Sequence, residues 1–107
     1  MNEENVMDDL TWDEFQKVEL RVGTIIAAEI FKEARKPAFK LQINFGNKIG
    51  IKKSSAQITD HYKPSELVGK QIGPMMSECL VTGFVQEDGS VILSVPDKEV
   101  SNGLRLA

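Results

Sequence analysis

The stretch AFKLQINFGNKIGIKKS, residues 38–54, predicts a β-hairpin. Its first half places apolar side chains at every second position, which is typical of a strand with one buried face and one wet face. These apolar residues are Phe39, Leu41, Ile43 and Phe45. Gly46 and Asn47 tolerate positive φ, so they predict a tight turn. A returning strand is expected over residues 48–54.

The segment before the hairpin predicts a longer strand. Residues 17–31, KVELRVGTIIAAEIF, alternate apolar with polar side chains over much of their length. Gly23 lies in the middle of this segment, where a bulge or a sharp bend is tolerated. Further upstream, Thr11 and Glu14 have the spacing of a capping box, so we expect a short helix to begin after Thr11.

The segment after the hairpin predicts a helical insertion. In GIKKSSAQITDHY, residues 50–62, the alternation stops, and Ser54 or Ser55 is expected to cap a helical turn. The following stretch KPSELVGK, residues 63–70, predicts a short helix, because proline favours a helix start and glycine favours a helix end.

The C-terminal third predicts a second hairpin. Residues 77–84 and 90–95 read as strands, and Asp88-Gly89 between them is a turn signal. The last residues, 96–107, show little regular pattern. A long strand, a hairpin, a helical insertion and a second hairpin follow the order of a Greek-key barrel. We therefore predict an all-β chain, a single OB-fold (five-stranded Greek-key β-barrel) with short helices at the N-terminus and between strands.

Composition fits one compact domain. The chain has 107 residues, of which 41% are hydrophobic and 27% are charged. No apolar run approaches the roughly 20 residues of a membrane span, so we expect no membrane insertion. The N-terminus is acidic where a signal peptide would be basic, and the single cysteine excludes an internal disulfide. These features predict a cytoplasmic protein.

Charge is distributed unevenly along the chain. Residues 1–14 carry six acidic side chains and no basic ones, which leaves ten acidic against thirteen basic side chains in the rest. We therefore divide the chain into an acidic N-terminal extension with a helix start, 1–14, and an OB-fold domain, 15–107. Within residues 32–53 seven basic side chains face one acidic side chain, Glu33. This cluster either attracts a polyanion or forms an ordinary solvated lysine face.

Five ordered blocks of the sequence resemble a known family. KVELRVGTI, PAFKLQINFG, GIKKSSAQIT, MMSECLVTG and PDKEVSNG are similar to the OB-fold tRNA-binding domain family, and within it to the CsaA-type protein secretion chaperones. The resemblance extends from Phe15 to Gly103. Relatives include the C-terminal domain of bacterial methionyl-tRNA synthetase and free-standing tRNA-binding proteins.

The resemblance breaks at one point. Family members carry a further strand and loop where Gln71 is here followed directly by Ile72. The glycines and Pro74 around this point also disfavour a strand. A barrel without this strand leaves two open edges, which is unfavourable for a protein in water. Two interpretations remain: a strand that belongs here is missing from this sequence, or the barrel is truncated.

The polar cluster after Ile51 is the candidate binding region. Lys52 and Lys53 are adjacent in a strand and therefore face opposite sides, so one of them reaches the surface groove of an OB-fold. Short neutral side chains from serine and glutamine suit base edges and 2′-hydroxyls, although the serines alternatively satisfy their own backbone. Lys40 and Asn44 extend from the polar side of the neighbouring strand.

The resemblance adds Ser77 and Glu78 to this binding surface. Met76 suits a surface that adapts to varied peptide side chains, although a core position is the alternative. The complete set of candidate binding residues is Lys36, Lys40, Asn44, Lys52, Lys53, Ser54, Ser55, Gln57, Met76, Ser77 and Glu78.

These observations predict a binding module that is not an enzyme. One histidine and one cysteine make neither a catalytic triad nor a usual zinc site, so we expect no catalytic residues, no metal and no cofactor. The resemblance implies a cytoplasmic export chaperone that binds unfolded precursors or peptides. The alternative is a structure-specific tRNA-binding module, free-standing or assisting an aminoacyl-tRNA synthetase. The resemblance also implies a homodimer, with Trp12, Phe15 and Leu104 as candidate contacts.

Overall fold

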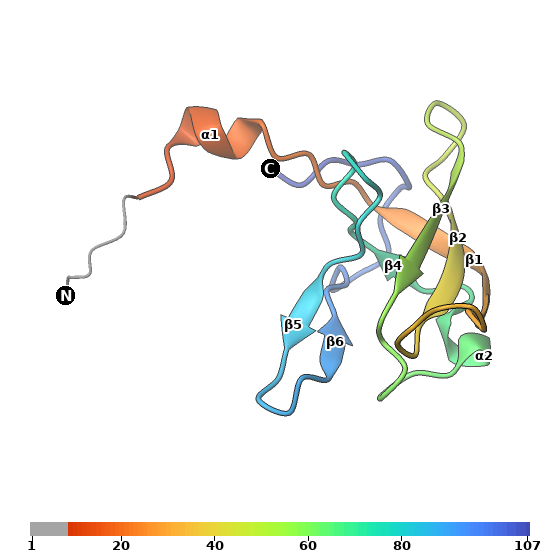
Figure 1. Ribbon diagram of the computed structural model, residues 1–107. Helices are drawn as coiled ribbons and strands as arrows, with labels where there is room; N and C mark the ends of the chain where they lie inside the picture. The colour runs from red at the N-terminus through yellow and green to blue at the C-terminus, as the bar shows by residue number, and fades with distance from the viewer. Residues whose placement is uncertain (1–8) are drawn as a thin grey trace.

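The computed structural model describes residues 9–107 of the chain (Figure 1). Its elements, in chain order, are α1 (Trp12–Gln16), β1 (Gly23–Ile30), β2 (Phe39–Asn44), β3 (Ile51–Ala56), α2 (Pro64–Leu67), β4 (Gln71–Ile72), β5 (Gly83–Val85) and β6 (Val91–Leu93). Neither helix in this described part is long and apolar enough to cross a membrane. Of the predicted acidic extension, residues 1–8 lie outside the described residues, so the proposed domain division stays a prediction.

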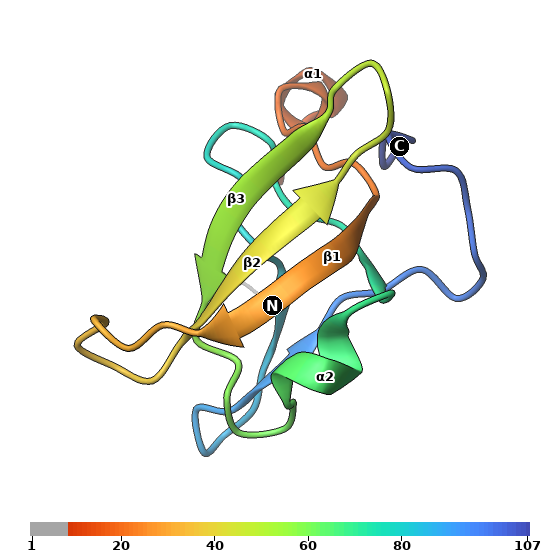
Figure 2. The ribbon, with the colours of Figure 1, turned by 90° about the vertical axis from the view of Figure 1, so that its right-hand side faces the viewer.

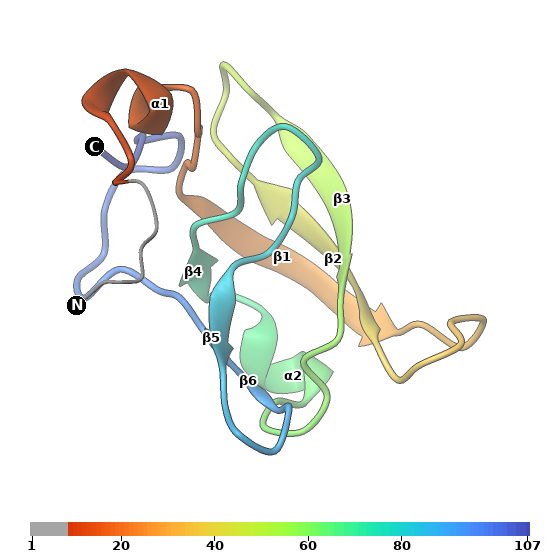
Figure 3. The ribbon, with the colours of Figure 1, turned by 60° about the vertical axis from the view of Figure 1, so that its left-hand side comes forward.

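The strands form a curled sheet and a separate ribbon. The larger antiparallel sheet has the spatial order β3-β2-β1-β4, and β5 pairs with β6 in a two-stranded ribbon. Figure 2 shows the sheet face-on, and Figure 3 shows the ribbon facing the curled sheet with α2 near its base. The sheet has the curvature of a half-barrel, which confirms the predicted small all-β OB-like fold.

The core lies inside the curl. The alternation predicted for β2 is confirmed, because Phe39, Leu41 and Ile43 are buried while Lys40 and Gln42 are exposed. Other elements contribute the buried apolar side chains Ile25, Phe45, Ile58, Leu67, Ile72 and Leu93. Burial of Leu67 and Leu93 holds α2 and the ribbon against the sheet, because removing apolar surface from water is the main favourable term in folding.

The bulge in β1 and the start of this strand lie at other positions than the sequence predicts. The bulge lies between Ile25 and Ala27, two residues after Gly23. Gly23 instead marks a close approach, since a Cβ atom there would lie 2.5 Å from Ile43 Cγ2 and 2.9 Å from the Phe45 ring. The strand also begins at Gly23, so the predicted strand over 17–31 is too long at its N-terminal end.

The helical turn predicted at Ser54 or Ser55 is wrong. β3 continues through both serines to Ala56 and pairs along its whole length with β2. Ladder hydrogen bonds and the burial of Ala56 against the core outweigh the capping tendency of serine at this point. The short helix α2 forms within its expected segment. The second hairpin, β5–β6, also forms, but β5 covers Gly83–Val85, so most of the strand predicted over 77–84 is wrong.

The place where the resemblance breaks contains a very short strand. β4 has two residues, and it pairs only with Gly23 and Thr24 of β1. The barrel wall of the described chain is therefore short at this point. The C-terminal tail supplies the missing support at this end of β1. Gly103 N donates to Val22 O at 2.7 Å, and Val22 N donates to Leu104 O at 2.9 Å.

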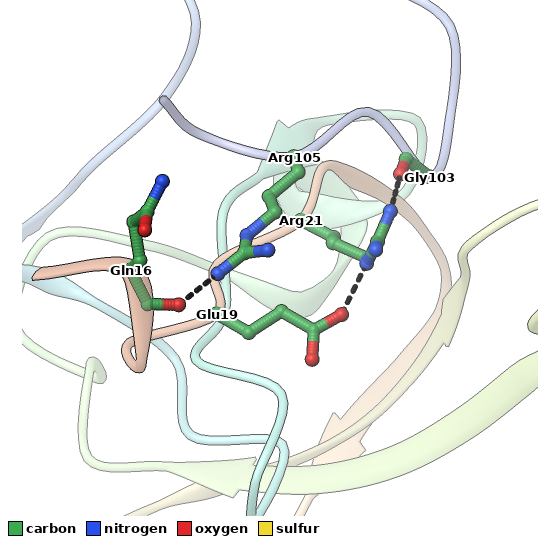
Figure 4. Close-up of polar contacts among 5 residues, drawn as sticks. All are labelled: Gln16, Glu19, Arg21, Gly103 and Arg105. Carbon is green, nitrogen blue, oxygen red and sulfur yellow. Dashed lines mark hydrogen bonds and ion pairs between the residues drawn. The ribbon is translucent and has the colours of Figure 1, made fainter. Parts of the chain in front are cut away.

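Side chains fix the tail in this position. Arg21 donates from Nε to Glu19 Oε2 at 2.5 Å and from a terminal nitrogen to Gly103 O at 2.7 Å, and Arg105 donates to Gln16 O (Figure 4). The hydrogen bond from Arg21, followed by a smaller charge effect, lowers the pKa of Glu19 below its ordinary value. Charge-assisted hydrogen bonds thus link the tail to α1 and to the segment between α1 and β1.

The predicted N-terminal helix is confirmed as a capped turn. Thr11 Oγ1 accepts from Glu14 N at 3.1 Å, and Glu14 Oε1 accepts from Thr11 N at 2.9 Å. Hydrogen bonds from Thr11 lower the pKa of the Glu14 carboxyl. The same helix stacks Trp12 beside Phe15, with ring centroids 5.9 Å apart.

Candidate binding surface

The strand register places four of the predicted polar residues, Lys40, Asn44, Lys53 and Ser55, on one face of the sheet. Residues directly opposite each other in neighbouring strands share a face, so three rows cross β1, β2 and β3. The rows are Glu29–Lys40–Ser55, Ala27–Gln42–Lys53 and Thr24–Asn44–Ile51. We call this the outer face, because the alternate rows contain the core residues Ile25, Leu41 and Phe39. The sheet thus assembles a polar surface from three separate stretches of sequence.

A groove of about 660 Å³ is lined by residues of these rows and of the alternate rows. Its lining runs from the C-terminal half of β1 and Phe31, across β2 and β3, to residues 78–80 beyond β3. Lys40, Gln42, Lys53 and Ser55 supply polar groups, and the lining also includes apolar residues. The apolar members are Ala27, Ala28, Phe31, Leu41 and Leu80. The groove can therefore contact both charged and apolar parts of a ligand.

Lysine 40 is held over an aromatic ring at one end of the groove. Its Nζ lies 4.8 Å from the centre of the Phe31 ring and 3.6 Å from Glu33 Oε1. The cation–π contact and the exposed ion pair together orient the ammonium group, each with a modest energy. Phe31 was not among the predicted site residues, although its position beside the basic cluster was a usable signal.

Ser54 occupies the groove in a structural role. Its hydroxyl donates to Cys79 O at 2.6 Å and joins β3 to the segment 78–80. Cys79 is buried and has φ of 50°, which is unusual for a residue with a Cβ. Burial raises the pKa of the Cys79 thiol, and the nearby Lys52 charge acts in the opposite direction. The sequence predicts that a serine here bonds to the backbone of its own turn. Ser54 instead bonds to the distant backbone carbonyl of Cys79.

A second, neighbouring concavity contains other predicted residues. Lys36, Ser55 and Gln57 line a depression of about 370 Å³, together with Phe31 and Arg35. Ser55 belongs to both concavities, so the two are continuous along one end of β2 and β3. All seven basic side chains of residues 32–53 are exposed. The basic side chains of this cluster are thus available to solvent.

The remaining predicted residues lie apart from the groove or at its border. Asn44 is on the outer face, but its Oδ1 accepts from Gly46 N at 2.9 Å and supports the turn. Lys52 is exposed on the opposite face from Lys53, as the alternation predicts. Met76 is half-buried and packs against the core, whereas Glu78 lines the groove. Ser77 beside it is exposed.

Gln42 and Leu80 are also among the groove residues that the sequence prediction did not include. Gln42 faces outward between Lys40 and Asn44, and the strand alternation alone placed it on the polar side. Leu80 is 45% exposed, although it looked like part of a buried strand. Only the turn at Cys79 and the lack of a neighbouring strand in the described chain bring Leu80 to the surface.

An apolar surface lies on another side of the molecule. α1 and the C-terminal tail together expose Trp12, Leu104 and Leu106, which are 64%, 52% and 56% accessible. Two shallow depressions of about 160 and 310 Å³ lie here, and both are lined in part by Arg105 and Leu106. Phe15 lines the smaller depression.

Fold and groove together define the class: a small OB-like protein with a groove of mixed basic and apolar lining. No family model matches the chain. The structure is similar to the chaperone CsaA from Bacillus anthracis str. Ames, with a TM-score of 0.86, 41% identity, and coverage of 95% of this chain and 100% of that chain. It is also similar to the CsaA chaperone protein from Picrophilus torridus, with a TM-score of 0.84, 42% identity, and coverage of 92% and 100%.

Synthetase relatives share the same module. A methionine–tRNA ligase from Chlorobium chlorochromatii (strain CaD3) is 34% identical over 105 residues, which are 88% of this chain. This chain spans only 14% of the length of that ligase. A MetRS-related protein from Pyrococcus horikoshii has a TM-score of 0.78 and 28% identity, with coverage of 94% and 100%. The chain belongs to the CsaA-like tRNA-binding family.

Proposed function

We propose that this protein is a non-catalytic cytoplasmic chaperone that binds unfolded polypeptides before their export. The groove is the observation that carries the proposal. An unfolded chain exposes apolar side chains and unpaired backbone groups together, and this lining offers Phe31 and Leu80 beside Lys53 and Ser55. The two similar structures named as CsaA chaperones support this assignment.

A binding assay with a permanently unfolded protein tests the proposal. We expect the wild-type chain to bind a reduced and carboxymethylated protein and to slow the aggregation of a thermally unfolded one. Leu80→Asp should weaken binding, because it places a charge among the apolar contacts of the groove. Val68→Asp is the matched control, since Val68 is similarly exposed, at 50%, and does not line the groove. Equal affinity of both variants would contradict the groove as the binding site.

We propose tRNA binding as the second candidate function. The exposed basic cluster of residues 32–53 supports it, as does the similarity to methionine–tRNA ligases. Phosphate contacts release counterions, so tRNA affinity should fall steeply between about 50 and about 200 mM salt. Capture of apolar segments should change little or strengthen over the same range. Tight, salt-sensitive binding of tRNA without binding of unfolded protein would make this second function the primary one.

We further propose that the protein is a homodimer built through the apolar surface of α1 and the tail. Trp12, Phe15 and Leu104 are the expected contacts, and their neighbourhood is more apolar than the groove. A two-fold dimer carries two grooves, which increases the avidity for a long client. Leu104→Glu should lower the mass measured by sedimentation equilibrium to that of a monomer. Val85→Glu is the control, because Val85 is also exposed, at 73%, on the separate ribbon.

A further inference from the structure

β3 is the outermost strand of the sheet and has a free edge. It pairs with β2 on one side, and in the described part of the chain no strand pairs with its other side (Figure 2). The contact recorded across this edge comes from a side chain, the hydrogen bond of Ser54 Oγ to Cys79 O. Such an edge carries backbone N–H and C=O groups that are available to another strand.

The alternation of hydrogen-bonded pairs between β2 and β3 identifies the backbone groups that are available at this edge. Phe45 N donates to Gly50 O at 2.9 Å, and bonded pairs recur at every second residue of an antiparallel ladder. Lys52, Ser54 and Ala56 therefore direct their backbone groups toward β2. The backbone groups of Ile51, Lys53 and Ser55 point away from the sheet. The edge thus presents three consecutive pairing positions.

The edge lacks two features that usually block strand addition, a proline and a bulge, whereas its lysines oppose an added strand that carries no acidic groups. β3 has six regular residues without proline, and the bulge of this sheet is in β1. The groove provides space beside it, because Lys53, Ser54 and Ser55 line one part and residues 78–80 line another. In the described part of the chain no strand is paired beyond this edge.

Charge selects the kind of strand that fits. Lys52 and Lys53 are exposed on opposite faces of β3, so an incoming strand meets an ammonium group on each face. A second copy of β3 would bring four lysines together, and like charges close across a ladder are destabilising. A strand with acidic side chains on both faces is complementary. A nucleic-acid backbone has no alternating N–H and C=O groups, so it pairs with the lysines but not with this edge.

We propose that β3 binds an extended, acidic polypeptide segment as an added strand in the groove beside residues 78–80. This inference rests on the proposed binding of polypeptides and names its mode: backbone pairing at Ile51, Lys53 and Ser55, with charge pairing at Lys52 and Lys53. Backbone pairing provides affinity for many sequences, and the lysines select segments that carry carboxylates.

The test uses a synthetic peptide with the sequence VTVEEVTV, blocked at both ends and labelled with a fluorophore. Anisotropy gives its affinity, and amide hydrogen exchange followed by NMR gives the contact. We expect the amides of Lys53 and Ser55 to gain about tenfold protection or more, because they become hydrogen-bonded. The amides of Lys52 and Ser54 should change little, since they already bond to β2. Methylation of both central backbone nitrogens of the peptide should weaken binding about tenfold or more.

Charge exchange provides the matched controls. The peptide VTVKKVTV should bind the wild-type chain about tenfold more weakly, and the double variant Lys52→Glu/Lys53→Glu should reverse this preference. Lys98→Glu should leave the preference unchanged, because Lys98 is exposed on the tail away from β3. If the preferred peptide changes when the charges of the protein are exchanged, the peptide and the lysines of β3 pair directly.

Two results distinguish a failure of the proposed strand addition from a failure of the proposed polypeptide binding. If unfolded protein and VTVEEVTV bind while the amides of Lys53 and Ser55 stay unprotected and the methylated peptide binds equally well, strand addition is wrong but polypeptide binding stands. If neither polypeptide binds while tRNA does, the inference and the proposed chaperone function are both wrong.

Discussion

The side-chain amide of Gln71 forms two hydrogen bonds with the backbone of Val100. Its Nε2 donates to Val100 O at 2.6 Å, and its Oε1 accepts from Val100 N at 3.0 Å. The same Nε2 lies 3.1 Å from Asn102 Oδ1, which also accepts from Thr24 Oγ1 at 2.9 Å. The side chain of this glutamine in β4 thus forms the pair of backbone hydrogen bonds that a neighbouring strand would form with Val100. These bonds hold the tail against β1. This contact stabilises the chain where the barrel wall is shortest.

Gln71→Ala should therefore destabilise the protein. The substitution removes both bonds to Val100 and leaves two backbone groups without partners, which costs roughly 2 kcal/mol. The measurement is the free energy of unfolding from urea titration. Gln57→Ala is the control, because Gln57 is exposed at the end of β3 and should change stability by less than about 0.5 kcal/mol. Equal effects of the two substitutions would show that the tail is held by other contacts.

The adjacent serines of β3 should respond differently to substitution. Ser54→Ala removes the hydrogen bond to Cys79 O and should cost about 1 kcal/mol of folding stability. Ser55→Ala removes an exposed hydroxyl and should cost less than about 0.5 kcal/mol. Chemical denaturation of both variants measures the difference. If Ser55→Ala proved the more costly change, the assignment of Ser54 as the link to residues 78–80 would be wrong.

Gly23 should be intolerant of a side chain. Gly23→Ala places a Cβ atom 2.5 Å from Ile43 Cγ2 and 2.9 Å from two atoms of the Phe45 ring. Overpacking of this kind costs about 1–3 kcal/mol or more, because the core must shift to accept the methyl group. Gly73→Ala is the matched control, since a Cβ atom there meets nothing within 4 Å. Thermal unfolding of both variants should show a lower midpoint for Gly23→Ala alone.

Glu19 should make stability depend on acid pH. Its pKa in the folded chain lies below the ordinary value of 4.5, chiefly because Arg21 donates a hydrogen bond to the carboxylate. The folded state therefore binds the proton less readily than the unfolded state. The stabilisation is complete above pH 4.5 and is lost as pH falls through the lowered folded pKa.

The variant Glu19→Gln isolates this contribution. We expect it to be less stable than the wild-type chain at neutral pH, with the difference closing progressively below pH 4.5. Urea titrations at several pH values measure the gap. Added salt should also narrow it at neutral pH, since the pair is only half-buried. A gap that stays constant down to strongly acid pH would exclude the carboxylate–guanidinium contact as its cause.

Several features of the fold follow from local sequence. The alternation over residues 38–54 determined which side chains of β2 enter the core, because strand side chains alternate strictly between two faces. The Thr11–Glu14 spacing determined the cap of α1, and Asp88-Gly89 determined the turn between β5 and β6. In each case the deciding contacts lie within a few residues, so the pattern alone predicts the result.

Other features depend on contacts that the sequence pattern does not reveal. Ser54 and Ser55 have the composition of a cap, yet pairing with β2 extends the strand through them. Leu80 became part of the groove only because the segment 78–80 lies beside an edge that no described strand covers. The role of Gln71 depends on contacts with Val100 and Asn102 of the tail, about 30 residues farther along the chain. Sequence by itself determined the strands, the turns and the position of the polar cluster, whereas tertiary structure decided which polar groups bind the chain itself and which remain available to a partner. The physical reason is that hydrogen-bond partners and open edges arise from long-range packing, which local periodicity does not encode.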